Sequence, residues 1–243
     1  MTLLLRRDIA AENNLSETAF CVKRDGYYDL RWFTPSMEID LCGHATMASA
    51  FVLFEETERA ARTIQFKTLS GLLAVTREND LLYLDFPARP VAACPMYSTF
   101  EKAFGVPPVA AYKAADFLVE LDHENTVRNL SPDFSAIRHL GAKAGRESDH
   151  FGVIVTARGS DCDFVSRFFA PGLGIDEDPV TGRAHCSLIP FWREKLGKSK
   201  LVARQLSRRG GVLFCEDRGD RVKIGGRAVR YLRGDIAIKR NEI

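Results

Sequence analysis

Residues 31–45 read RWFTPSMEIDLCGHA, and they decide the fold because a similar stretch returns in the second half of the chain. That second copy is residues 167–184, RFFAPGLGIDEDPVTGRA. Each copy runs from a strand through a proline stop and an acidic loop to a Gly-x-Ala that opens a helix. We therefore predict two similar halves, with the chemistry located where the halves face each other.

The elements predicted around the two copies follow one order, which is strands, a helix, and strands again. The predicted helices are 3–13, 45–55, 98–104, 134–141 and 184–196. The predicted strands are 18–22, 28–33, 63–68, 72–77, 81–86, 110–121, 151–157, 163–169, 206–215, 221–225 and 234–239. This order predicts an α+β fold of two pseudo-symmetric lobes, each a mostly antiparallel sheet rolled round a central helix. We place the lobes at 1–90 and 96–233, with the last strand, near 234–243, completing the first lobe.

Composition, charge and cysteine usage limit the partners, the bound groups and the compartment that we expect. The net charge of +2 gives no reason to expect nucleic acid or an anionic membrane surface as a partner. No apolar run is long enough to span a bilayer, and residues 1–7 are too short for a signal peptide. The six cysteines form no CxxC pair, so we expect neither a disulfide framework nor a metal site, and a reduced, cytoplasmic setting.

The two Gly-x-Ala corners are candidate binding points for a small carboxylate. Gly43 and Gly182 have no Cβ, so a ligand can approach their backbone closely. Each precedes a helix whose first N–H groups lack an intrahelical partner and carry partial positive charge. A single glycine of this kind is better explained as a loop end, but the matched pair favours binding of an anionic substrate.

Three further polar residues are candidates for the chemistry, and each allows more than one interpretation. Glu17 is either a solvent-facing glutamate, which the residue pattern alone favours, or a desolvated carboxylate whose raised pKa suits a general acid–base. His44 is either a helix-capping polar residue or a neutral imidazole with one donor and one acceptor to offer. Asp178 either orients a base or accepts a hydrogen bond from the substrate, or, as the pattern favours, it complements the positive end of the following helix.

The repeat also bears on a third hypothesis, in which the chain is an amino-acid racemase that uses two thiols. Such an enzyme needs a second cysteine at the place that matches Cys42, and that place is Thr181. A threonine is no base at neutral pH, so Cys42 is better explained as a small buried apolar residue. Arg183 matches His44 in the repeat; it either binds a carboxylate bidentately, which we favour, or faces solvent or a partner subunit.

Several motifs together resemble the PhzF-like family. They are NLSETAF at 14–20, RWFTP at 31–35, EIDLCGHAT at 38–46, EDPVTG at 177–182 with Ala184-His185-Cys186, and QLSxRGG at 205–211. They follow the order of that family along most of the chain, and as a set they are highly specific.

The resemblance implies the diaminopimelate-epimerase fold and a cofactor-free isomerase, acting in the cleft between the lobes. The founding member of the family rearranges trans-2,3-dihydro-3-hydroxyanthranilate in phenazine biosynthesis. The acid–base glutamate of the family falls on Glu17, with supporting residues at His44 and Asp178. One carboxylate serves both proton-transfer steps if the substrate stays bound. Predicted substrate contacts are Asn14, Ser16, Gly43, Ala45, Thr181, Gly182 and Arg183.

Two departures from the family pattern bear on activity. The family usually has serine where this chain has Arg183, and it has a strand and a Gly-Asn-Pro-Ala loop before the helix that opens this sequence. We expect a small anionic carboxylic acid as the substrate and a homodimer as the assembly. The competing hypothesis is a non-catalytic member of the fold that binds a small molecule or a protein.

Overall fold

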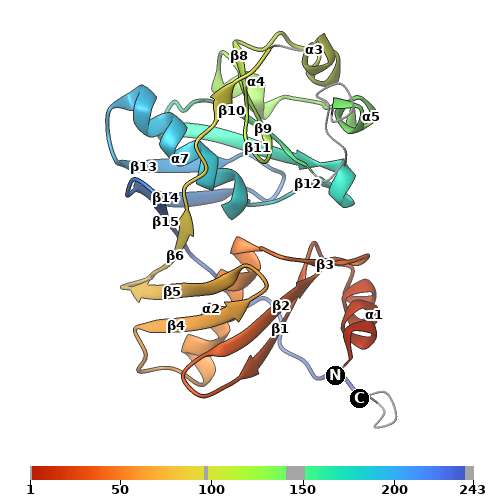
Figure 1. Cartoon of the computed structure of the whole chain (residues 1–243), viewed down its shortest axis with the longest axis vertical. Coiled ribbons are helices and arrows are strands. Elements are labelled where there is room, and N and C mark those ends of the chain that lie inside the picture. The colour runs from red at the N-terminus through yellow and green to blue at the C-terminus, as the bar shows by residue number, and fades with distance from the viewer. Residues whose placement is uncertain (1, 96–97, 141–150, 239–243) are drawn as a thin grey trace. The chain divides into compact units, whose positions relative to one another are not determined.

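The computed structural model describes residues 2–95, 98–140 and 151–238, and contacts divide the chain into two compact units (Figure 1). Unit 1 holds Met1–Asp85 and Gly225–Ile243, and unit 2 holds Phe86–Ile224. The limits given by the sequence, 1–90 and 96–233, differ from these chiefly in assigning residues 225–233 to the second unit.

Unit 1 is built on a sheet whose strands lie in the order β1 (Thr18–Lys23), β2 (Tyr28–Phe33), β4 (Thr63–Thr68), β5 (Gly71–Glu78) and β6 (Leu81–Pro87). The short β3 (Glu38–Ile39) pairs with β2. Neighbouring strands are antiparallel except β2 and β4, which are parallel. A parallel pair needs a long crossover, and helix α2 (Gly43–Glu56) supplies it. Helix α1 (Leu3–Asn13) contacts β1 and β2.

The sheet of unit 1 buries one face, as alternating side chains require. Ile64 and Phe66 of β4 are buried while the residues beside them are exposed or half-buried. Leu82 and Leu84 of β6 follow the same alternation. Helix α2 contacts β1 and β5, and Phe54 is among its buried residues. The hydrophobic period of 2 in the strands therefore fixes which side the helix covers.

Unit 2 has a longer sheet. Its order is β15 (Arg221–Gly226), β14 (Gly211–Asp217), β13 (Lys200–Gln205), β11 (Phe164–Ala170), β10 (Val153–Arg158), β9 (Phe117–Glu120), β8 (Ala110–Lys113) and β7 (Ala92–Ala93). Two neighbouring pairs, β11 with β13 and β10 with β9, are parallel. Helix α7 (Gly182–Leu196) crosses from β11 to β13 and contacts β13 and β14.

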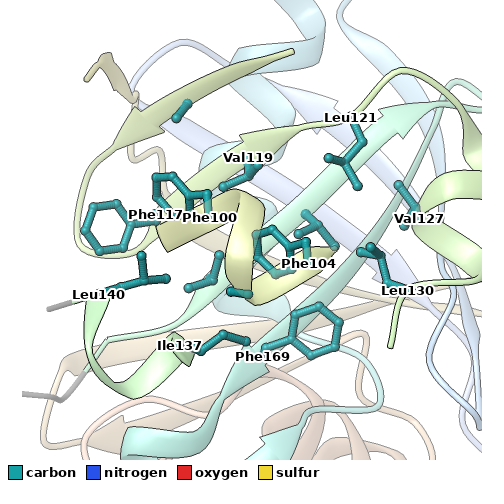
Figure 2. Packing of buried hydrophobic residues seen from close by; sticks show 14 of the residues in the cluster. Phe100, Phe104, Phe117, Val119, Leu121, Val127, Leu130, Ile137, Leu140 and Phe169 are labelled. Atoms are coloured by element: carbon teal, nitrogen blue, oxygen red, sulfur yellow. The ribbon is translucent and has the colours of Figure 1, made fainter. Parts of the chain in front are cut away.

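A phenylalanine-rich core fills unit 2 on the side of its short helices, α3 (Ser98–Phe104), α4 (Glu124–Arg128) and α5 (Phe134–Arg138). Figure 2 shows Phe100 and Phe104 of α3 among side chains from β9, β11 and the other two helices. The rings of Phe100 and Phe117 meet edge-on with centroids 5.5 Å apart, and both are fully buried. This geometry is the one aromatic pairs prefer.

The structure confirms the internal repeat. In unit 1, Arg31 of β2 forms a bidentate ion pair with Glu38 of β3. In unit 2, Arg167 of β11 pairs in the same way with Glu177 of β12 (Ile175–Glu177), at 2.7 and 3.0 Å. Each unit thus has a strand, a short return strand held by Arg and Glu, a helix that begins at a glycine, and a strand parallel to the first.

Three predicted strands need correction. Residues 206–215 do not form one strand. Strand β13 ends at Gln205, a turn follows, and β14 begins at Gly211. Gly210 stands in the left-handed region at φ +70° and donates its N–H to Ser207 Oγ, which closes the turn. The strand predicted at 110–121 breaks at 114–116 into β8 and β9. Residues 234–238 form no strand, and residues 239–243 lie outside the described residues. Residue 141, the last residue of the helix predicted at 134–141, also lies outside them.

None of the helices formed by the described residues is both long and apolar enough to span a membrane.

Candidate functional site

Glu17 stands at the corner between α1 and β1. The helix ends at Asn13, and Asn14 takes a left-handed conformation (φ 47°) with its N–H donated to the carbonyls of Ala10 and Ala11. This sharp turn places Glu17 one residue before β1 begins. Its side chain is 6% exposed, so the solvent-facing interpretation favoured by the residue pattern is wrong.

His44 is the partner of this buried carboxylate. It is the second residue of α2, and its Nε2 lies 2.8 Å from Oε2 of Glu17. The His44 side chain is 32% exposed, so one end of the pair meets solvent while the carboxylate lies inside. The contact joins residues 27 positions apart in the sequence (44 − 17 = 27).

Two opposing effects act on the pKa of Glu17. Burial raises the pKa, while the hydrogen bond and charge of His44 and the side chains of Ser16 and Cys42 lower it, and the net direction is downward. Desolvation raises this pKa as expected, but the expected net increase is wrong because sequence alone did not show the His44 contact. Glu17 is therefore a buried carboxylate whose charged form is favoured by its polar neighbours.

Cys42 completes the group in unit 1. Its Sγ lies 3.7 Å from Nε2 and 3.8 Å from Nδ1 of His44. The residue is 5% exposed, and burial raises the pKa of its thiol despite the neighbouring His44. Donor atoms of Glu17, Cys42 and His44 all lie within 4.8 Å of one another, so these are residues able to share a metal ion.

The start of α2 agrees with the predicted anion corner in one respect. Its N-cap, Cys42, makes no side-chain cap hydrogen bond. Gly43 and Ala45, both predicted substrate contacts, are buried there. Of the other predicted contacts in unit 1, Ser16 is half-buried and Asn14 is exposed. Contact of any of them with a substrate stays a prediction.

Asp178 lies in the matching loop of unit 2 and is 7% exposed. Its Oδ2 accepts a hydrogen bond from Thr181 Oγ1, and its backbone N–H donates to Phe168 O at 3.1 Å. Thr181 is the N-cap of α7, a position where threonine normally caps the helix. Because its hydroxyl serves Asp178 instead, α7 also begins at Gly182 without a side-chain cap.

Gln205 holds this loop in place through hydrogen bonds, although its residue type and position in the sequence did not mark it as part of the site. Its Nε2 donates to Asp178 O at 2.7 Å and to Thr181 Oγ1 at 3.1 Å, and its Oε1 accepts from Thr181 N at 2.8 Å. The residue is 1% exposed. A glutamine that ends a buried strand inside a family motif was the available signal.

We expect Gln205→Leu to lower the free energy of unfolding by about 1–3 kcal/mol, because the buried Thr181 N–H loses its acceptor. Urea unfolding followed by far-ultraviolet circular dichroism measures this change. Gln65→Leu is the matched control: Gln65 is exposed on β4, so its replacement should stay within about 0.5 kcal/mol of the parent. Equal effects of the two variants would contradict the bracing role.

Arg183 points its guanidinium at a carboxylate of its own unit. Nε donates to Asp116 Oδ2 at 2.8 Å and Nη2 to Asp116 Oδ1 at 2.7 Å. Asp116 is 5% exposed and also accepts the N–H of Gly152. The predicted bidentate pairing of Arg183 is thus made with the protein in this structure, and its contact with substrate stays a prediction.

His185 is a structural histidine. It is fully buried on α7, where Nδ1 lies 2.7 Å from Thr181 O, and burial lowers the pKa of the imidazole to about 4. The predicted site residues therefore form two groups. Unit 1 brings together Ser16, Glu17 and His44 with Cys42, and unit 2 brings together Asp178, Thr181 and Gly182 with Gln205.

Comparisons with known proteins agree with this architecture. A family model described as phenazine biosynthesis-like protein matches residues 6–234. A Pseudomonas aeruginosa protein named as an uncharacterized isomerase is 49% identical over 235 residues, which cover 96% of this chain and 87% of that protein. The crystal structure of a PhzF-family phenazine biosynthesis protein from Enterococcus faecalis matches with a TM-score of 0.91 at 46% identity, over 98% of this chain and 89% of that one.

A more distant match shows the fold alone. The crystal structure of a hydroxyproline epimerase from Agrobacterium vitis has a TM-score of 0.58 at 12% identity, over 88% of this chain and 72% of that one. The predicted fold class is confirmed by these matches together, as is the family resemblance drawn from the motifs.

Proposed function

Because the chain belongs to the phenazine biosynthesis-like protein family, whose matched relatives include proteins named as isomerases, we propose that it moves a proton within a small carboxylic acid, with Glu17 as the proton carrier. The substrate class and the role of Glu17 are the parts that go beyond family membership.

One observation carries the proposal, and it is the buried Glu17 carboxylate 2.8 Å from His44 Nε2. A side chain that is 94% buried (100 − 6 = 94) is poorly hydrated, so little water must be displaced before it meets a carbon-bound proton. His44 favours the charged form of this carboxylate and thereby lowers its pKa. A charged, weakly hydrated carboxylate is the state that a general base needs at the start of a reaction.

The proposed cycle conserves every atom of the substrate. The Glu17 carboxylate removes a proton from one carbon, and the electron pair left behind shifts along the substrate to a second carbon. Protonated Glu17 then returns a proton to that second carbon and is again a carboxylate. His44 supports the charged form of Glu17 at both ends of the cycle, and the resemblance gives Asp178 a second supporting role.

The carboxylate group of the substrate is assigned to the uncapped start of α2, which lies in the same unit as Glu17. Both α2 and α7 begin at a glycine and lack a side-chain cap. Such helix starts present N–H groups and a partial positive charge to an anion. This arrangement supports a negatively charged substrate over a neutral one.

Exchange in deuterated water tests the proposal even while the substrate is unidentified. We expect the purified chain, incubated in D2O with a panel of small unsaturated and hydroxylated carboxylic acids, to place deuterium on carbon in at least one of them. Nuclear magnetic resonance detects the label and its position. The expected product is an isomer of the starting acid that carries deuterium at the newly protonated carbon.

A thermal-shift screen of the same panel separates catalysis from binding alone. A compound that raises the melting temperature but neither gains deuterium nor forms an isomer identifies a binding protein without the proposed chemistry. That result, found for every compound that binds, is the outcome against the proposal.

A further inference from the structure

The turn between β13 and β14 brings two arginines to a surface pocket of unit 2. The pocket has a volume of about 370 Å³, and its lining residues are Glu177, Pro179, Ser207, Arg208 and Arg209. We propose that Arg208 and Arg209 bind an anionic group of a small molecule in this pocket, either a carboxylate or a phosphate. Binding itself does not depend on the proposed isomerase activity.

The turn that carries the arginines is fixed against the loop that precedes α7. Ser207 Oγ donates a hydrogen bond to Pro179 O at 2.7 Å and accepts the N–H of Gly210 at 3.0 Å. Gly211 lies so close to Val180 that a Cβ added to it would stand 2.5 Å from Val180 Cγ2. A wall held in this way loses little conformational freedom when a ligand binds, which favours binding.

The other side chains at the start of the QLSxRGG motif have partners inside unit 2. Gln205 and Ser207 hydrogen-bond to the loop before α7, and Leu206 packs against the phenylalanine-rich core. Arg208 and Arg209 are exposed, and among the described residues neither guanidinium group has a hydrogen bond or an ion pair. Their N–H donors are therefore available to a ligand.

The charges around the pocket favour an anion. Glu177 is the acidic residue of the lining, and Arg167 already neutralises it through two hydrogen bonds of 2.7 and 3.0 Å. The charges of Arg208 and Arg209 remain uncompensated by this carboxylate. A guanidinium group presents parallel N–H donors that match the oxygens of a carboxylate or a phosphate, so the pocket favours these groups over neutral or cationic ones.

The volume of the pocket limits the size of the ligand. Pockets that bind small molecules typically have volumes of about 300–1,000 Å³. A volume of about 370 Å³ lies at the lower end of that range. The ligand is therefore a small acid or phosphate ester, or the anionic end of a somewhat larger molecule.

Nuclear magnetic resonance of the full-length chain tests the site through the arginine side chains, using isotopically labelled arginine. The probes are inorganic phosphate and succinate at constant ionic strength, and the one that binds more tightly identifies the preferred anionic group. We expect at least one probe to shift the Nε–H signals of Arg208 and Arg209 along a saturable curve. Arg208→Gln and Arg209→Gln should each weaken this binding at least about tenfold, because each removes hydrogen bonds to a charged group.

Arg158→Gln is the matched control. Arg158 is an exposed arginine on β10 of the same unit and lies outside the lining of the pocket, so its replacement should leave the affinity for the probe unchanged. Circular dichroism establishes that each variant is folded. Signals of Arg208 and Arg209 that do not saturate with either probe, or equal weakening in Arg158→Gln and Arg209→Gln, would overturn the proposal.

A kinetic comparison shows which molecule supplies the anionic group, and this step rests on the proposed function. An anionic group on the substrate predicts that Arg209→Gln raises KM more than it lowers kcat for the acid that the exchange screen identifies. An unchanged KM together with weakened probe binding assigns the pocket to a separate small anion. A parent chain that binds the probe but exchanges no deuterium supports the pocket and contradicts only the proposed function.

Discussion

The Glu17→Gln variant is expected to isomerise the substrate about 100- to 10,000-fold more slowly than the parent chain, which is the range that a general acid–base supplies. The amide keeps the shape of the side chain but accepts no proton from carbon. The measurement is the rate of deuterium incorporation into the substrate that the exchange screen identifies.

The fold of this variant should persist. Glutamine fills the same volume at the corner after Asn14, and its side-chain oxygen still faces Nε2 of His44. Far-ultraviolet circular dichroism and the urea midpoint should therefore stay close to those of the parent. A slow variant with a lost fold would reflect misfolding, so only a folded variant counts in this comparison.

Removing the guanidinium of Arg183 should have the second large effect. Arg183→Leu leaves the Asp116 carboxylate, 5% exposed, with the Gly152 N–H but without the two charged hydrogen bonds of 2.7 and 2.8 Å. An uncompensated buried charge of this kind lowers the free energy of unfolding by about 3 kcal/mol. Urea unfolding of the variant and the parent measures the difference.

Two further variants show whether the buried charge is the cause. Adding Asp116→Leu to Arg183→Leu removes both charges and should recover part of the lost stability. Arg204→Leu breaks an exposed pair with Asp161 in the same unit and should cost less than about 1 kcal/mol. A loss in Arg183→Leu no larger than that in Arg204→Leu would contradict the structural role of Arg183.

The local pattern of the sequence predicted most of the fold because the evidence for it is local. The proline stops, the glycines before α2 and α7, and the alternation in β4 and β6 each depend on a few neighbouring residues. The repeat added a long-range constraint, and the matching ion pairs Arg31–Glu38 and Arg167–Glu177 confirm it. The prediction of a strand across 206–215 was wrong because the turn at Gly210 interrupts an otherwise apolar run.

The site was less predictable because its energetics depend on contacts far apart in the sequence. The residues around Glu17 indicate an exposed corner, and only the approach of α2 with His44 explains a buried carboxylate with a lowered pKa. Arg183 and Asp116 are 67 residues apart, and no local pattern links them. The family motifs named Glu17, His44 and Asp178, but they gave no reason for Gln205, whose part is to hold the loop of Asp178.

The most direct test compares deuterium incorporation in two variants of equal charge change, Glu17→Gln and Glu12→Gln, with the parent chain. Glu12 lies on the exposed part of α1 in the same unit, so its replacement should leave the rate unchanged. We predict a rate for folded Glu17→Gln at least about 100-fold below that of Glu12→Gln. Equal rates in the two folded variants would show that another group carries the proton.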